Sequence, residues 1–390
     1  MKKLSRLGGI SLGLSVILMS CSAPAGTDLP VIDVISAFKN EKQLKMSEII
    51  DHIEYIKLET TPDCLIGNGQ VLKVGNSIYV KNFNPAKILV FDNQGKFQRQ
   101  ISRQGKGPGE YVNFAYFDVS PDNRYVAVGG FDNTINLYST EGQFITSEQT
   151  NVQFFSGFLF LNRNYLITYE AMLDIPMKGY PILLARNSND FKADTLLRMD
   201  WETQQSDMVL PMKYSPCYLF NGRINFMEPA NDTLYQFGND HKISPRLIIN
   251  CGDRAVTREK TFITSDTYPI PVYPICETSD YLFMNAGMGE NFGVLAYNKK
   301  TGETFRLPQT NNTYGPENDL EGIDFSFNRL KTGNQTWTSL LQVSELKSFF
   351  NSEKPDHLNL KTQENFNELK KLTGQSDVND NPIVRILYLK

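Results

Sequence analysis

The chain has 390 residues, of which 41% are hydrophobic and 21% charged, a composition that is usual for a folded globular protein. Its formal net charge is −4, and this falls to −7 without residues 1–20, which carry three basic residues and no acidic one. A moderately acidic chain lacks the basic stripe of a nucleic-acid-binding protein, so we expect no nucleic acid among its partners.

The N-terminus has the three parts of an export signal. Three basic residues within positions 1–6 precede an apolar stretch at 7–19 that is too short to span a bilayer comfortably, which takes about 20 residues. This pattern predicts a removed signal peptide over residues 1–20. The sequence Leu-Met-Ser-Cys at 18–21 resembles the bacterial lipobox, so Cys21 is the predicted lipid attachment site. The alternative is an ordinary signal peptide with an incidental cysteine.

The body of the chain repeats a hairpin. The segment at 88–97 is a strand, a turn closed by glycine and a strand that opens with phenylalanine, and the segment at 135–144 repeats this pattern 47 residues later. Weaker copies start near residues 183, 233 and 294. A repeated unit of about 40 to 60 residues with four strands has the size of a propeller blade. The predicted blades are 68–102, 113–150, 152–200, 215–250, 274–308 and a composite last blade.

The sequence therefore predicts an all-β, six-bladed β-propeller over residues 46–390, preceded by a lipidated tether and linker at 21–45. The last blade would combine 320–390 with the N-terminal strand near 50–60, because closing the ring removes open strand edges. Helical spacing near 343–351 and 362–372 predicts a short helical insertion in this blade. A two-sheet sandwich is the alternative fold, but it has no natural place for a 47-residue repeat.

Three ordered stretches carry a family resemblance. They are Gly-Lys-Gly-Pro-Gly-Glu-Tyr at 105–111, Asn-Asp-Thr-Leu-Tyr at 231–235 and Asp-Asn-Pro-Ile-Val-Arg-Ile-Leu at 380–387. Together with the lipobox they resemble the six-bladed, NHL-like propeller lipoproteins of Bacteroides-type bacteria, a largely uncharacterised group. The resemblance implies the fold and export, and it implies no reaction. Surface lipoproteins of this group often carry acids just after the cysteine; none occurs before Asp28, which favours a periplasm-facing outer-membrane anchor over the cell surface.

The loop at 105–111 is not a phosphate loop, because it fits neither glycine-rich nucleotide motif. An inter-blade turn is one interpretation, since glycine supplies positive φ and proline fixes its own φ. In the other, the loop faces a ligand. The candidate ligand-binding residues are then Arg103, Lys106, Glu110 and Tyr111 of this loop, together with the two tryptophans, Trp201 and Trp337.

Metal and cofactor chemistry finds no support in the motifs. The histidines His52, His241 and His357 are far apart, and Asp-Val-Asn-Asp-Asn at 377–381 lacks the glycine and glutamate of a calcium loop. We expect no metal and no cofactor. Four further cysteines are scattered, without the spacing of a zinc or redox site. They are Cys64, Cys217, Cys251 and Cys276, whose pairing the sequence leaves open.

Two functions compete. The first is a non-catalytic module that binds a glycan, a peptide or a protein through the loops at one end of the propeller. The second is a propeller enzyme acting on glycans or peptides, with its site assembled from several blades. The absence of a linear catalytic motif favours binding, and no catalytic residue is assigned.

Overall fold

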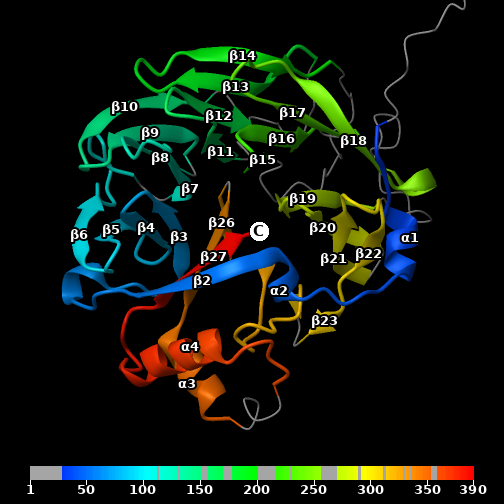
Figure 1. Ribbon diagram of the computed structural model, residues 1–390. Helices are drawn as coiled ribbons and strands as arrows, with labels where there is room; N and C mark the ends of the chain where they lie inside the picture. Colours follow the sequence, from blue (N-terminus) through cyan, green and yellow to red (C-terminus); the bar gives the residue numbers. More distant parts are fainter. Residues whose placement is uncertain are drawn as a thin grey trace, which may run out of the picture.

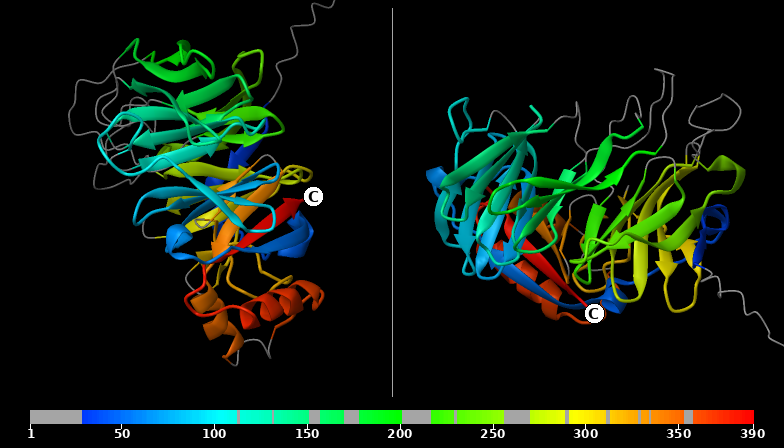
Figure 2. Two further views of the ribbon diagram at one scale, coloured as in Figure 1. Left: turned by 90° about the vertical axis from the view of Figure 1, so that its left-hand side faces the viewer. Right: turned by 90° about the horizontal axis from the view of Figure 1, so that it is seen from above.

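The computed structural model describes residues 29–111, 114–130, 132–150, 157–169, 178–200, 217–228, 231–255, 270–288, 291–310, 313–327, 330–333, 335–352 and 358–390. Six antiparallel sheets stand around a common centre, and one edge of each faces it (Figure 1). Turned views show the sheets as separate blades, with the helices of the last blade projecting to one side (Figure 2). The predicted all-β, six-bladed propeller is confirmed.

Each of the first five blades is built from four consecutive strands, with the first strand innermost. Blade 1 contains β3 (Gly69–Val74), β4 (Ser77–Asn82), β5 (Lys87–Asp92) and β6 (Phe97–Ile101). Blade 2 contains β7 (Phe114–Val119), β8 (Tyr125–Gly130), β9 (Thr134–Ser139) and β10 (Phe144–Gln149). Blade 3 contains β11 (Gly157–Phe160), β12 (Tyr165–Tyr169), β13 (Pro181–Asn187) and β14 (Ala193–Arg198). Blade 4 contains β15 (Cys217–Phe220), β16 (Arg223–Met227), β17 (Thr233–Phe237) and β18 (Ser244–Asn250). Blade 5 contains β19 (Val272–Glu277), β20 (Tyr281–Met288), β21 (Asn291–Asn298) and β22 (Thr304–Arg306).

The middle strands of a blade are buried on both faces, because each sheet packs between two neighbouring sheets. In β4 every residue from Ile78 to Asn82 is buried, and in β5 the same holds from Ile88 to Phe91. An alternating sequence pattern therefore does not mark a solvent face here. The four described cysteines form no disulfide with one another, and Cys64, Cys251 and Cys276 are buried as small apolar groups.

The repeated hairpins join the two outer strands of a blade, as predicted. The turn glycines Gly95, Gly142 and Gly302 have φ of 79°, 89° and 75°, which is the left-handed region that glycine adopts at little cost. They close β5–β6, β9–β10 and β21–β22 respectively. The glycine of the repeat is thus explained by backbone geometry.

The ring closes in blade 6 by joining the two ends of the described chain. The sheet has the order β2 (Ile50–Lys57), β27 (Ile383–Leu389), β26 (Thr336–Leu341) and β25 (Lys331–Thr332), so the N-terminal strand is outermost. The antiparallel register runs from Ile50 opposite Leu389 to Lys57 opposite Ile383. The predicted closure is confirmed, and it pairs edges that would otherwise remain open.

Two helices interrupt blade 6 between β26 and β27, again as predicted. They are α3 (Val343–Phe350) and α4 (Glu364–Gly374), and they lie outside β2 on the rim of the ring (Figure 1). Leu346 and Leu369 are buried against the core that blade 6 shares with blade 5. Helix α4 ends at Gly374. Short elements complete the connections: β23 (Gln309–Thr310), β24 (Thr313–Tyr314) and the single 3₁₀ turns Pro62–Cys64 and Gly252–Arg254.

Residues 31–45 are not a simple linker, which corrects this part of the predicted tether and linker at 21–45; residues 21–28 lie outside the described residues. β1 (Val31–Asp33) pairs in parallel with β18, and α1 (Val34–Lys39) packs on β22. The reason is apolar burial, since Ile32, Val34 and Ala37 are 0% exposed. The Asp33 carboxylate caps α1 by accepting a hydrogen bond from Ser36 N at 3.0 Å.

This N-terminal strap, residues 31–49, then follows the outer edge of the ring to blade 6 (Figure 1). On blade 5, Lys42 N donates to Arg306 O at 3.1 Å, and Arg306 N donates to Asn40 O at 2.8 Å. Next comes α2 (Met46–Ile49), where Ser47 Oγ donates to Asp319 Oδ2 at 2.7 Å. The strap therefore joins blades 4, 5 and 6 before the chain enters β2.

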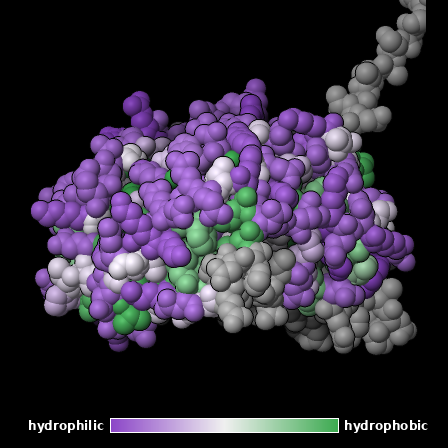
Figure 3. All heavy atoms as spheres, turned by 60° about the horizontal axis from the view of Figure 1, so that its bottom comes forward, coloured by the Kyte–Doolittle hydropathy of each residue, from purple (hydrophilic) through white to green (hydrophobic). Residues whose placement is uncertain are grey.

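On the face shown in Figure 3, hydrophilic residues cover most of the surface and apolar side chains form separate small groups. Within the described residues, no helix combines the length and the apolar character needed to cross a membrane.

Gly95→Ala is expected to destabilise the closed ring by about 2–4 kcal/mol. Alanine at this positive φ costs about 1 kcal/mol, and its β carbon would lie 2.1 Å from the Lys57 carbonyl oxygen at the seam between blades 6 and 1. Gly302→Ala is the matched control, because Gly302 occupies the same turn of blade 5, has φ of 75° and has no atom within 4 Å of that position. Urea unfolding measures both; equal losses would show that the seam tolerates the extra atom.

Candidate functional site

The loop predicted to face a ligand, residues 103–111, folds back on itself between β6 and β7. Glu110 Oε2 accepts a hydrogen bond from Gly107 N at 2.8 Å, and Glu110 Oε1 accepts one from Arg103 Nε at 2.5 Å. The backbone donor and then the guanidinium hold the pKa of Glu110 below its usual value. The carboxylate is therefore engaged within its own loop.

The other residues of this loop divide between surface and core. The Arg103 side chain is 79% exposed and Lys106 is exposed, so both stay predicted ligand contacts. Tyr111 is only 2% exposed and packs edge-on against Phe114, with ring centroids 4.8 Å apart. Its place is the core between blades 1 and 2, and its ring has no face to offer a ligand.

The tryptophan predictions have different outcomes. Trp337 is 0% exposed in β26, and its ring lies 5.9 Å from that of Phe283 and 5.7 Å from that of Phe327. A ring enclosed in this way is a core residue and not a ligand contact, which corrects the prediction for Trp337. Trp201 lies outside the described residues, as does Cys21.

A site that the sequence did not indicate lies between β4 of blade 1, β7 of blade 2 and β25 of blade 6. Lys81 of β4 is 3% exposed, and its ammonium group donates to the Ala115 carbonyl of β7. Burial, together with the positive charge of Lys331, lowers the pKa of Lys81 to about 7. The Lys81 nitrogen also lies 4.9 Å from the centre of the Phe83 ring and 5.3 Å from that of Phe114.

Lys331, at the start of β25, provides the second amine. Its ammonium donates to the Phe117 carbonyl at 3.3 Å and lies 3.5 Å from Asp118 Oδ1. Asp118 is itself held in place, because its Oδ2 accepts a hydrogen bond from Phe160 N of blade 3 at 2.8 Å. We call Lys81 and Lys331 the inner lysine pair.

Both residues of the inner lysine pair contact the same strand. Ala115 and Phe117 are two residues apart in β7, and Ala115 lies where the register of β7 against β8 shifts, between Phe114 and Tyr116. Both belong to the innermost strand of blade 2, whose inner edge has no partner strand in the sheet. Two amines and one carboxylate therefore meet where three blades converge, which leaves an excess positive charge.

Elsewhere, the most buried charges are neutralised inside the blades. Glu277 accepts hydrogen bonds from Arg246 and Lys299 between blades 4 and 5. Glu321 accepts hydrogen bonds from Arg385 at 2.8 Å and from Tyr55 at 2.7 Å within blade 6. Hydrogen-bonded pairs of this kind are typical of structural networks. Among the described residues, no group of three or more His, Cys, Asp or Glu side chains is placed to hold a metal ion.

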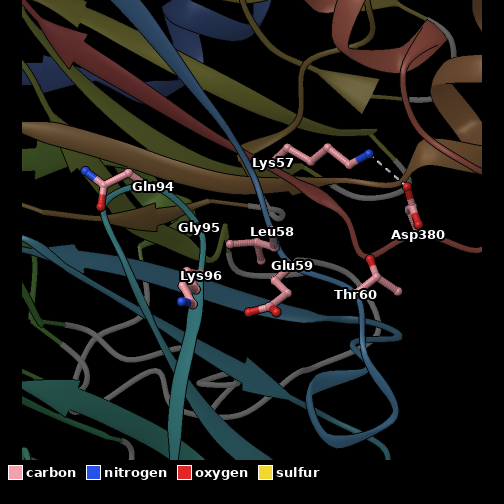
Figure 4. A pocket seen from close by; sticks show the side chains of 8 residues that line it. All are labelled: Lys57, Leu58, Glu59, Thr60, Gln94, Gly95, Lys96 and Asp380. Atoms are coloured by element: carbon pink, nitrogen blue, oxygen red, sulfur yellow. Dashed lines mark ion pairs between the residues drawn. The ribbon is translucent and has the colours of Figure 1, made fainter.

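A shallow pocket of about 380 Å³ lies at the closure seam, on the outer side of the ring (Figure 4). It is lined by the end of β2, the β5–β6 turn and Asp380, whose Oδ2 pairs with Lys57 Nζ at 2.9 Å. The Lys57 amine and a backbone donor hold the pKa of Asp380 below its usual value. The pocket is therefore a groove between blades 6 and 1. Its ion pair lies within blade 6, and the Glu59 carboxylate accepts a hydrogen bond from Phe97 N of blade 1 at 2.8 Å.

Comparison with known proteins identifies a family. The model of a family described as Domain of unknown function (DUF4934) matches residues 29–388, so the chain belongs to that family. No curated protein matches the chain.

Two solved structures from Bacteroides species are similar to this chain. A Bacteroides fragilis protein thought to be exported is 19% identical, with a TM-score of 0.62, over 92% of this chain and 99% of that one. A member of the DUF4221 family from Bacteroides vulgatus is 11% identical, with a TM-score of 0.49, over 87% of this chain and 97% of that one. The first similarity supports the same propeller architecture.

Proposed function

We propose that this member of the DUF4934 family is an exported lipoprotein, anchored through Cys21, whose propeller is a non-catalytic module that binds a glycan, a peptide or a protein. The anchor is supported by the lipobox-like sequence at 18–21. In the sequence, residues 22–30 separate this cysteine from β1, where the N-terminal strap begins.

The observation that carries the binding role is the inner lysine pair. A charged, partly exposed position where several blades meet is the usual place for a propeller ligand, because loops of every blade surround it. The buried acids Glu277 and Glu321 are by contrast already engaged: Glu277 accepts hydrogen bonds from Arg246 and Lys299, and Glu321 accepts them from Arg385 and Tyr55. A carboxylate held in this way is a poor general acid or base.

One observation favours the alternative, a propeller enzyme acting on glycans or peptides. A lysine whose pKa is about 7 is partly uncharged at neutral pH, and an uncharged amine is a base and a nucleophile. Arrays of glycans and of peptides probed with the purified full chain distinguish the two functions. Stable retention of a restricted set supports binding, whereas product release that stops in Lys81→Thr supports the enzyme.

Cys21→Ala is expected to abolish membrane anchoring. Without the thiol no lipid can be attached, so the protein should appear in a soluble or an uncleaved form. Intact-mass measurement of the detergent-extracted native protein should give a lipidated chain that begins at Cys21. A mature chain that begins elsewhere, or that lacks the lipid, would contradict the anchor. Protease treatment of intact cells should leave the protein whole, because we place it facing the periplasm.

A further inference from the structure

We propose that the inner lysine pair is an oxyanion site, at which Lys81 and Lys331 together bind a sulfate, phosphate or carboxylate group carried by the ligand. This inference rests on the proposed function, because it specifies the chemistry that the binding module recognises. It does not depend on the anchor or on the size of the ligand.

Two neighbouring blades make the same kind of contact to the next blade with different residues. In blade 6, Thr338 of β26 donates to the Val71 carbonyl on the inner strand of blade 1. In blade 1, Lys81 of β4 donates in the same way to the Ala115 carbonyl on the inner strand of blade 2. A neutral hydroxyl therefore suffices to join one blade to the next.

A lysine at that position carries a cost that threonine avoids, because its ammonium group must leave water. Within the described residues, no carboxylate is close enough to form an ion pair with Lys81 and offset this cost; the Ala115 carbonyl and two aromatic rings are its neighbours. An anion from outside the protein would offset this desolvation cost by pairing with the Lys81 ammonium group.

The inner lysine pair is reachable from solvent and carries a net positive charge. The Lys331 side chain retains 24% of its exposure, and Phe83, whose ring contacts the Lys81 ammonium, is 45% exposed. Amines that contact two carbonyls of one strand, two residues apart, can approach one tetrahedral or planar oxyanion from two sides. Asp118 neutralises one positive charge of the pair, so one remains for the ligand.

Isothermal titration calorimetry of the purified full chain with sodium sulfate tests the proposal, with sodium chloride at equal ionic strength as the reference. Sulfate is suitable because its charge is constant between pH 6 and 9. We expect saturable binding at pH 6.5 that is at least tenfold weaker in Lys331→Met and in Lys81→Thr. Sodium acetate, as a second probe, shows whether a carboxylate is also accepted.

The control is Lys192→Met, which removes an amine that is 85% exposed on the turn of blade 3 and should leave sulfate binding unchanged. Binding should also weaken as the pH rises through about 7, because Lys81, whose charged neighbours in this site are Lys331 and Asp118, loses its proton there. If Lys81→Thr does not fold, Lys331→Met and the pH series carry the test.

Equal sulfate affinity in the native chain and in Lys331→Met, or no saturable binding at pH 6.5, would overturn the oxyanion site. These outcomes differ from failure of the proposed function. If the arrays retain no glycan or peptide while sulfate binding depends on both lysines, the oxyanion site is supported and the proposed macromolecular ligand is contradicted.

Discussion

Deletion of residues 383–390 is expected to abolish cooperative folding of the entire propeller. The segment is β27, which lies between β2 and β26, so its loss separates the N-terminal strand from blade 6. Four apolar side chains of β27 are 0% exposed, namely Ile383, Val384, Ile386 and Leu387. At about 1.5–3 kcal/mol for each buried side chain, their loss is comparable with the whole net stability of a domain, about 5–15 kcal/mol.

Thermal and urea unfolding of the full and shortened chains check this expectation. The shortened chain should lack a cooperative transition, or show a midpoint many degrees lower. Val378→Ser is the matched control, because this residue lies just before β27 and is 51% exposed. A deletion that shifts the midpoint by no more than a degree would mean that the ring does not depend on its closure.

Most of the fold was predictable because a propeller repeats one local pattern. The glycine turn with its flanking aromatic residues recurs, and the left-handed φ at Gly95 and Gly142 explains why the pattern is visible in the sequence. Ring closure followed from counting strands at the two ends. The helical insertion was visible because the spacing of apolar residues near 343–351 and 362–372 changes from strand to helix period.

The N-terminal strap was missed for a physical reason. Its first part is short, with three residues in β1 and six in α1, and short elements have weak periodicity. It is stabilised by tertiary contacts, namely pairing with β18 and the hydrogen bonds to Arg306. Such contacts join segments more than 200 residues apart and leave no local signal.

The inner lysine pair was missed because alternation misleads in a propeller. Lys81 occupies a polar position in an alternating strand, where a sheet with one solvent face would expose it. Both faces of β4 are covered by neighbouring blades, so the same residue is 3% exposed. The loop at 103–111 stood out because of its glycines. The structure explains Gly109 by its φ of 74° and the other two by the close approach of the Glu110 side chain to Gly105 and Gly107.

Glu277→Ala is expected to destabilise the protein by about 3–5 kcal/mol, because it leaves two cations without their shared carboxylate in a buried position. The Glu277 side chain is 0% exposed and accepts hydrogen bonds from Lys299 Nζ at 2.8 Å and from Arg246 at 2.7 Å. The second variant, Glu277→Ala with Arg246→Met, should recover part of this loss. Glu303→Ala is the control, because its pair with Lys42 is exposed and such pairs contribute about 0–1 kcal/mol.

The acid side of the stability curve provides an independent check on Glu277. Burial alone would raise the pKa of this carboxyl, but the hydrogen bonds and charges of Arg246 and Lys299 outweigh burial and hold the pKa below its usual 4.5. A depressed folded-state pKa contributes stability that is complete above about pH 4.5 and is lost as the pH falls through the lower value. The native chain should therefore lose stability in acid more steeply than Glu277→Ala, and urea midpoints measured from pH 7 to pH 3 should converge. Parallel curves would show that Glu277 keeps an ordinary pKa in the folded state, and that the charges between blades 4 and 5 are not coupled through it.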